Sequence, residues 1–168
     1  KAKDIMQRAP ALDLIGVNAY AGIGGVAGTL ATAGWQKPHV ITEWGPNGPW
    51  EVSKTTWGAE LEQTSTEKAA LYKSRYESAI LGNLEKCLGS YVFLWANKVE
   101  GTPTWFGLFM PTTAGEETEV VDVMNYVWSG AWPANRAPKI VSARINTRSA
   151  GQSPVLINDV GNIATVSY

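Results

Sequence analysis

Short apolar runs alternate with amphipathic segments along the first 130 residues of the chain. Runs typical of buried parallel strands occupy residues 13–18, 39–43 and 90–95. Around them, apolar residues recur with the helical period at residues 4–9, 22–33, 65–84 and 119–128. This alternation predicts an α/β fold in which right-handed βαβ units build a parallel sheet.

The clearest helical signal begins at residue 64. Thr64 and Glu67 have the spacing of a capping box, and large apolar residues then recur every four positions. Gly34 and Gly130 follow two other helical patterns, at the position where a left-handed glycine commonly ends a helix. These signals predict where three of the helices begin or end.

The connections between the elements differ in length. Two strand-to-helix loops run to about twenty residues and hold most of the tryptophans, whereas the helix-to-strand connections are short. Long loops in a compact domain are usually functional, and the carboxyl ends of parallel strands form the functional face. The chain also has eight Trp against three Phe, which favours a binding surface. A ligand site is therefore predicted beside Tyr20, Glu43 and Trp95.

The pattern changes after residue 131. A Pro- and Ala-containing stretch, residues 133–138, is typical of a linker, and residues 139–168 alternate apolar and polar positions between turn residues. Thirty residues are too few for a complete β-sandwich. We therefore predict three parts: an α/β unit at residues 1–132, the linker at residues 133–138, and the beginning of a β-sandwich-like module at residues 139–168.

Composition excludes several classes of function. The formal net charge of -1 gives no electrostatic case for nucleic acid, and no apolar run approaches the roughly 20 residues of a membrane span. A single cysteine and a single histidine exclude an intrachain disulfide and a Cys/His metal cluster, and no cofactor is expected. The chain starts without an initiator Met or a signal peptide, in what reads as the middle of a helix, so we expect further sequence upstream.

Three strand-end residues are candidates for chemistry. Glu43 ends the second apolar run, where a rigid strand can hold a carboxylate against a reacting carbon. Tyr20 follows the neighbouring strand, about 4.8 Å away, so its hydroxyl can reach Glu43. Trp95 ends the third run and can form an apolar floor for a sugar ring. The alternatives are a solvated acid, a Tyr packed under a loop and a core Trp.

Together these strand ends resemble the retaining (β/α)8 glycoside hydrolases, especially the family 2 barrel of β-galactosidase and β-glucuronidase type. That family shows Asn-x-Tyr after strand six, Thr-Glu-aromatic-Gly at strand seven and a Trp after strand eight. Here the motifs stand in the same order as Asn18-Ala19-Tyr20, Thr42-Glu43-Trp44-Gly45 and Leu94-Trp95. The resemblance covers about residues 1–130. It implies that the chain holds strands six to eight of a TIM barrel, followed by the start of a β-rich module.

By the same resemblance, Glu43 is the nucleophile of a retaining glycosidase acting on β-linked carbohydrate, Tyr20 is its hydrogen-bond partner and Trp95 is the sugar platform. The family's acid/base Glu lies after strand four, so we expect it in the upstream half of the barrel, and we expect the 168-residue chain alone to be inactive. The other candidate substrate-binding residues are Asn18, Trp44, Asn97 and Trp105. Glu51 and Glu100 are weaker candidates for the missing acid.

Other functions are compatible with parts of the same pattern. A non-catalytic carbohydrate-binding protein on the same scaffold is the main alternative, and a transglycosylase is the next. A pure binder needs no carboxylate at a strand end, so Glu43 favours an enzyme. A flavodoxin-like domain is disfavoured, because residues 22–25 match a phosphate loop only loosely and no Asp follows about twenty residues later. The resemblance implies a secreted or periplasmic protein, without naming a sugar.

Overall fold

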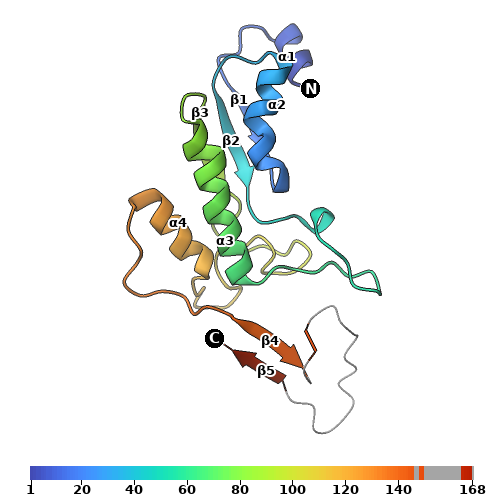
Figure 1. The fold of residues 1–168 in the computed structure, drawn as a ribbon, viewed down its shortest axis with the longest axis vertical. Helices are drawn as coiled ribbons and strands as arrows, with labels where there is room; N and C mark the ends of the chain where they lie inside the picture. Colours follow the sequence, from blue (N-terminus) through green and yellow to red (C-terminus); the bar gives the residue numbers. More distant parts are fainter. Residues whose placement is uncertain (146–147, 150–163, 168) are drawn as a thin grey trace.

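The fold is mixed α/β and is built on a small parallel sheet (Figure 1). The computed structural model describes residues 1–145, 148–149 and 164–167. Three strands form the sheet in the order β1–β2–β3: β1 (Ile15–Asn18), β2 (His39–Trp44) and β3 (Cys87–Val92). Both strand pairs are parallel, so the arrangement predicted from the alternating pattern is confirmed.

Helices connect the strands as the sequence predicted. They are α1 (Ala2–Arg8), η1 (Ala21–Gly25), α2 (Val26–Ala33), η2 (Pro49–Glu51), α3 (Ser65–Arg75), η3 (Tyr76–Ile80), η4 (Leu81–Asn83) and α4 (Glu119–Ser129). The long helix expected from residue 65 is a composite, because η3 is a π-type turn and η4 a 3-10 turn.

The predicted helix ends are also observed. The Thr64 hydroxyl accepts from the Glu67 N–H at 3.2 Å, and the Glu67 carboxylate accepts from the Thr64 N–H at 2.8 Å. This is a capping box at the start of α3. Gly34 and Gly130 end α2 and α4 with φ of 90° and 79°, a left-handed conformation that glycine adopts without a Cβ penalty.

The third strand begins and ends earlier than expected. The sequence pattern predicts it at residues 90–95, after Gly89, but Gly89 lies inside β3, near a shift in its register with β2. Past Val92 the chain leaves the sheet, because the Leu94 N–H donates to Phe106 O at 2.9 Å and the Leu108 N–H to Leu94 O at 3.2 Å. A glycine inside a strand often marks an irregularity in strand pairing, such as the register shift near Gly89.

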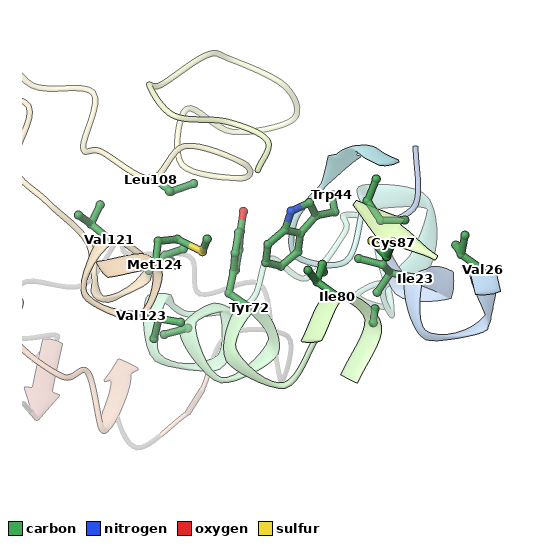
Figure 2. Close-up of a cluster of buried hydrophobic side chains, with 14 of the residues drawn as sticks. Ile23, Val26, Trp44, Tyr72, Ile80, Cys87, Leu108, Val121, Val123 and Met124 are labelled. Atoms are coloured by element: carbon green, nitrogen blue, oxygen red, sulfur yellow. The ribbon is translucent and has the colours of Figure 1, made fainter. Parts of the chain in front are cut away.

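The core lies between the sheet and the helices. Figure 2 shows a row of buried side chains running from Met124 through Tyr72 and Trp44 to Ile23. Ile15, Ile41 and Cys87, one from each strand, belong to the same cluster. In Figure 1, α4 lies alongside α3.

The helices bury only part of the sheet. Leu88 and Tyr91 on β3 are 61% and 69% exposed, and Gly16, Asn18 and Thr42 on the other two strands are exposed as well. Parallel sheets are normally covered on both faces. No element among the described residues covers these strand positions.

A two-stranded antiparallel ribbon follows α4. It consists of β4 (Ser142–Ile145) and β5 (Ala164–Ser167), so the β character predicted for residues 139–168 is observed in these two strands. The other positions of that pattern, within 146–147 and 150–163, lie outside the described residues. Residues 137–140 are tied to the helices, because the Thr66 hydroxyl bonds the backbone of Ile140 and the Asp122 carboxylate accepts from the Ala137 N–H.

Candidate active site

Glu43 lies at the carboxyl end of β2 with both carboxylate oxygens engaged. The Tyr20 hydroxyl donates to Oε1, and the Asn18 side-chain amide donates to Oε2 at 2.7 Å. The contact between Tyr20 and Glu43 that the strand ends predicted is therefore present. Two neutral donors from the end of β1 fix the orientation of this carboxylate.

The amide of Asn18 is itself oriented by β2. Thr42 donates its hydroxyl to Asn18 Oδ1 at 2.8 Å, which leaves the NH2 group to face Glu43. Thr42 in turn occupies space that only a glycine on β1 leaves open, since a Cβ on Gly16 would lie 2.6 Å from Thr42 Cγ2. Gly16, Thr42 and Asn18 thus form a chain of contacts that ends at Glu43.

Tyr20 is held on its other sides by aromatic rings. Its ring centroid lies 5.6 Å from that of Trp50, 5.3 Å from that of Phe106 and 6.5 Å from that of Phe93, and the Trp50 and Phe93 rings are nearly perpendicular to it. We call these four residues the Tyr20 cluster. Burial, and then the hydrogen bond to Glu43, raise the pKa of Tyr20 above its ordinary value. The hydroxyl therefore remains a neutral donor.

Gly45 lets the ends of β2 and β3 approach each other behind this cluster. A Cβ on Gly45 would lie 2.8 Å from Phe93 O and 3.1 Å from the Tyr72 hydroxyl. That hydroxyl donates to Phe93 O at 3.0 Å. The glycine of the Thr-Glu-Trp-Gly motif is thus required by close packing next to Glu43.

The loop after β2 is held in place by the polar side chains of Glu51 and Arg75. The carboxylate of Glu51 accepts from the Gly48 N–H at 2.9 Å and the Ala21 N–H at 3.2 Å. Arg75 of α3 donates to Gly45 O at 2.6 Å and to the Asn47 side chain. These bonds hold the loop against η1 and α3, and they commit Glu51 to a structural role.

The second long loop, residues 96–117, is tied to the same region. Lys68 of α3 pairs with Glu62 at 2.5 Å and donates to Thr104 O at 2.7 Å, and Thr102 donates to Glu62 at 2.5 Å. Burial lowers the pKa of Lys68, against the opposing effect of the Glu62 charge. An ion pair between the buried Lys68 and the half-buried Glu62 thus anchors both loops to the start of α3.

Trp95 does not join the Tyr20 cluster. It is half exposed, and its ring contacts are with Phe109 at 5.4 Å and Trp128 at 5.5 Å between centroids. The early end of β3 explains this, since the strand bonds continue only to Phe93 and the chain then turns to pair with residues 106–108. Phe93 contacts Tyr20 in the place where the sequence suggested Trp95.

Two other predicted substrate contacts are buried. Trp44 has no exposed surface and packs against Tyr72 and Tyr76, while Trp105 is buried and donates its indole N–H to Asn47 O at 2.9 Å. Neither side chain offers a surface to a substrate, contrary to the prediction. Asn97 is exposed and its amide donates to the Met110 carbonyl at 3.4 Å.

Sequence reasoning missed the aromatic environment of Tyr20. The sequence pattern places Phe93 inside the apolar run at residues 90–95 and Phe106 in the second long loop. The available signal was their apolar character beside the two strand ends, but their meeting depends on the turn after β3, which the pattern did not predict.

Comparison with known protein families and with curated proteins finds no match for the chain. Within the described ranges, no group of three or more His, Cys, Asp or Glu side chains is placed to hold a metal ion. In the same part of the chain, no helix has both the length and the apolar character needed to cross a membrane.

Proposed function

We propose that this protein is a retaining glycoside hydrolase for β-linked carbohydrate, with Glu43 as its nucleophile. The observation that carries the proposal is the double engagement of the Glu43 carboxylate by Tyr20 and Asn18 at the carboxyl end of a parallel strand. A nucleophilic carboxylate has to be held in one orientation toward the anomeric carbon, and rigid strand ends with neutral donors do this.

The reaction has two displacements. A Glu43 oxygen forms a bond to the anomeric carbon while the bond to the leaving oxygen breaks, and a second carboxyl group gives that oxygen its proton. Water then attacks the glycosyl ester, the second group takes the proton, and Glu43 leaves as a carboxylate. A transglycosylase would use the same ester, with a sugar hydroxyl in place of water.

The second carboxyl group should lie about 5–5.5 Å from the first in a retaining enzyme. Glu51 accepts two backbone N–H groups, and Glu100 is paired with Lys98, so both are committed to other contacts. We propose instead that the acid/base comes from an upstream part of a (β/α)8 barrel, as the resemblance implies. The exposed strand positions Leu88, Tyr91 and Thr42 support this, because closing a barrel would cover them.

The test is hydrolysis by the full-length protein, with the upstream part that supplies the acid/base, carrying Glu43→Gln. The change keeps the shape of the side chain and removes its nucleophilicity, and the Tyr20 hydroxyl can rotate to accept from the new amide. We expect turnover of aryl β-glycosides to be lost while the unfolding temperature is retained. Glu77→Gln, at an exposed position of η3, is the matched control, and equal activity in both variants would exclude Glu43 as nucleophile.

A further inference from the structure

Trp50, near Glu43, combines a highly exposed side chain with a fixed ring orientation. The residue is 68% exposed, yet its ring is fixed by two contacts, with Tyr20 at 5.6 Å and 89° and with Phe106 at 6.4 Å and 34°. Since Tyr20 donates directly to Glu43, only one side chain separates this indole from the carboxylate. We propose that Trp50 is the sugar-binding platform beside Glu43, an inference that rests on the proposed glycosidase function.

The local backbone holds Trp50 in place before any ligand arrives. Trp50 is the middle residue of the short helical turn η2, where Pro49 restricts the backbone and the Glu51 N–H donates to Gly48 O at 2.8 Å. The Glu51 carboxylate closes the same turn by accepting from the Gly48 N–H and from the Ala21 N–H, next to Tyr20. The turn that carries the indole is therefore bonded to the segment that carries the hydrogen-bond partner of Glu43.

Gly48 adds a second constraint. The indole folds back over the backbone at this residue, and a Cβ on Gly48 would lie 2.5 Å from Cε2 of Trp50. Only glycine leaves room for the ring in this position. A side chain at residue 48 would displace the ring without touching Glu43.

A flat, exposed indole suits one class of ligand. A pyranose ring of a β-linked glycan has an apolar face of C–H groups and a rim of hydroxyls, so it can stack on an aromatic ring while its polar edge reaches carboxylates and amides. A rigid exposed Trp loses little conformational entropy on binding. Trp95, by contrast, contacts Phe109 and Trp128 and not the Tyr20 cluster.

Stacking is made in the substrate complex and in the transition state alike, so its loss should raise KM and leave kcat nearly unchanged. For Trp50→Ala we expect KM for a β-linked tetrasaccharide to rise about ten- to thirtyfold, the effect typical of truncating a central aromatic contact. Trp50→Phe should recover part of this loss. Gly48→Ala should raise KM in the same direction by displacing the ring.

The experiment measures kcat and KM of the full-length protein, which includes the upstream part proposed to supply the acid/base, on β-linked tetrasaccharides of glucose, galactose, mannose and xylose, together with calorimetric binding of the same sugars to its Glu43→Gln variant. The controls are Trp132→Ala, which removes another partly exposed Trp with ring contacts, and Gly24→Ala, where an added Cβ meets nothing within 4 Å. Both controls should keep the wild-type KM.

The outcomes separate the two proposals. Turnover by wild type with a raised KM in Trp50→Ala supports both. If the wild type turns over sugar and Trp50→Ala keeps the same KM, the platform is overturned and the glycosidase proposal stands. The same holds if Trp50→Ala lowers only kcat and the unfolding temperature. Sugar binding without turnover, lost in Trp50→Ala, overturns the hydrolase and keeps the platform. Neither turnover nor binding overturns both.

Discussion

Replacing Tyr20 by Phe tests how the site controls the charge on Glu43. The change removes one hydroxyl and leaves the ring, which Trp50 and Phe106 continue to hold. Glu43 then keeps the Asn18 donor on Oε2 and loses the donor on Oε1. The carboxylate should stay in place but be less well stabilised as an anion.

The size of the rate change expected for Tyr20→Phe follows from the step in which Glu43 becomes negatively charged. During attack the Glu43 carboxylate loses its charge, and during hydrolysis of the glycosyl ester it regains it, so the Tyr20 hydrogen bond favours the second step. A hydrogen bond to a charged group is worth about 1.5–3 kcal/mol. That corresponds to roughly a 10- to 150-fold slower hydrolysis of the ester.

Rapid-mixing kinetics with a dinitrophenyl β-glycoside measures both steps, because release of the phenol reports formation of the ester. Tyr20→Phe should show a burst of phenol followed by a slow steady state. Tyr126→Phe, on the outer part of α4, should behave as wild type. A Tyr20→Phe variant whose steady-state rate is within twofold of wild type would refute this reasoning.

Three further predictions concern stability. Gly45→Ala places a Cβ 2.8 Å from a backbone carbonyl, so urea unfolding should show a loss of about 1–3 kcal/mol, with Gly24→Ala as the unaffected control. Burial lowers the pKa of His39, the chain's one histidine, so the folded state binds fewer protons than the unfolded chain. The free energy of unfolding should therefore fall as pH drops below about 6.5. His39→Gln should flatten this pH dependence, and an unchanged slope in that variant would contradict the prediction. Lys68→Met leaves the half-buried Glu62 carboxylate without its cation, so the free energy of unfolding in the same urea assay should fall by about 3–5 kcal/mol. A decrease below about 1 kcal/mol would show that the ion pair does not anchor the loops.

Sequence patterns were sufficient for the elements that depend on local signals. The capping box at Thr64, the left-handed glycine at Gly34 and the parallel pairing of the strands all follow from residue type and spacing. The contact between Tyr20 and Glu43 was also predictable, because neighbouring parallel strands place their last residues side by side.

The aromatic surroundings of the site could not be predicted in the same way. Gly89 lies within β3 rather than before it, so the strand ends at Val92 and the chain turns away before Trp95. The partner of that turn is the segment around Phe106, which lies within the long loop after the strand and has no regular pattern of its own. Side-chain direction at the end of β3 thus depends on a tertiary contact that periodicity does not encode.

The most direct measurement of the central claim is covalent trapping of the nucleophile. The protein is incubated with 2-deoxy-2-fluoroglycosyl fluorides of the common β-linked sugars, whose good leaving group needs no protonation and whose ester hydrolyses slowly, and the modified peptide is identified by mass spectrometry. We predict one glycosyl group per chain, bound to Glu43, and no modification of Glu43→Gln. A glycosyl group on Glu51, Glu100 or any other residue, or no adduct with any of these sugars, would contradict the assignment of Glu43 as the nucleophile.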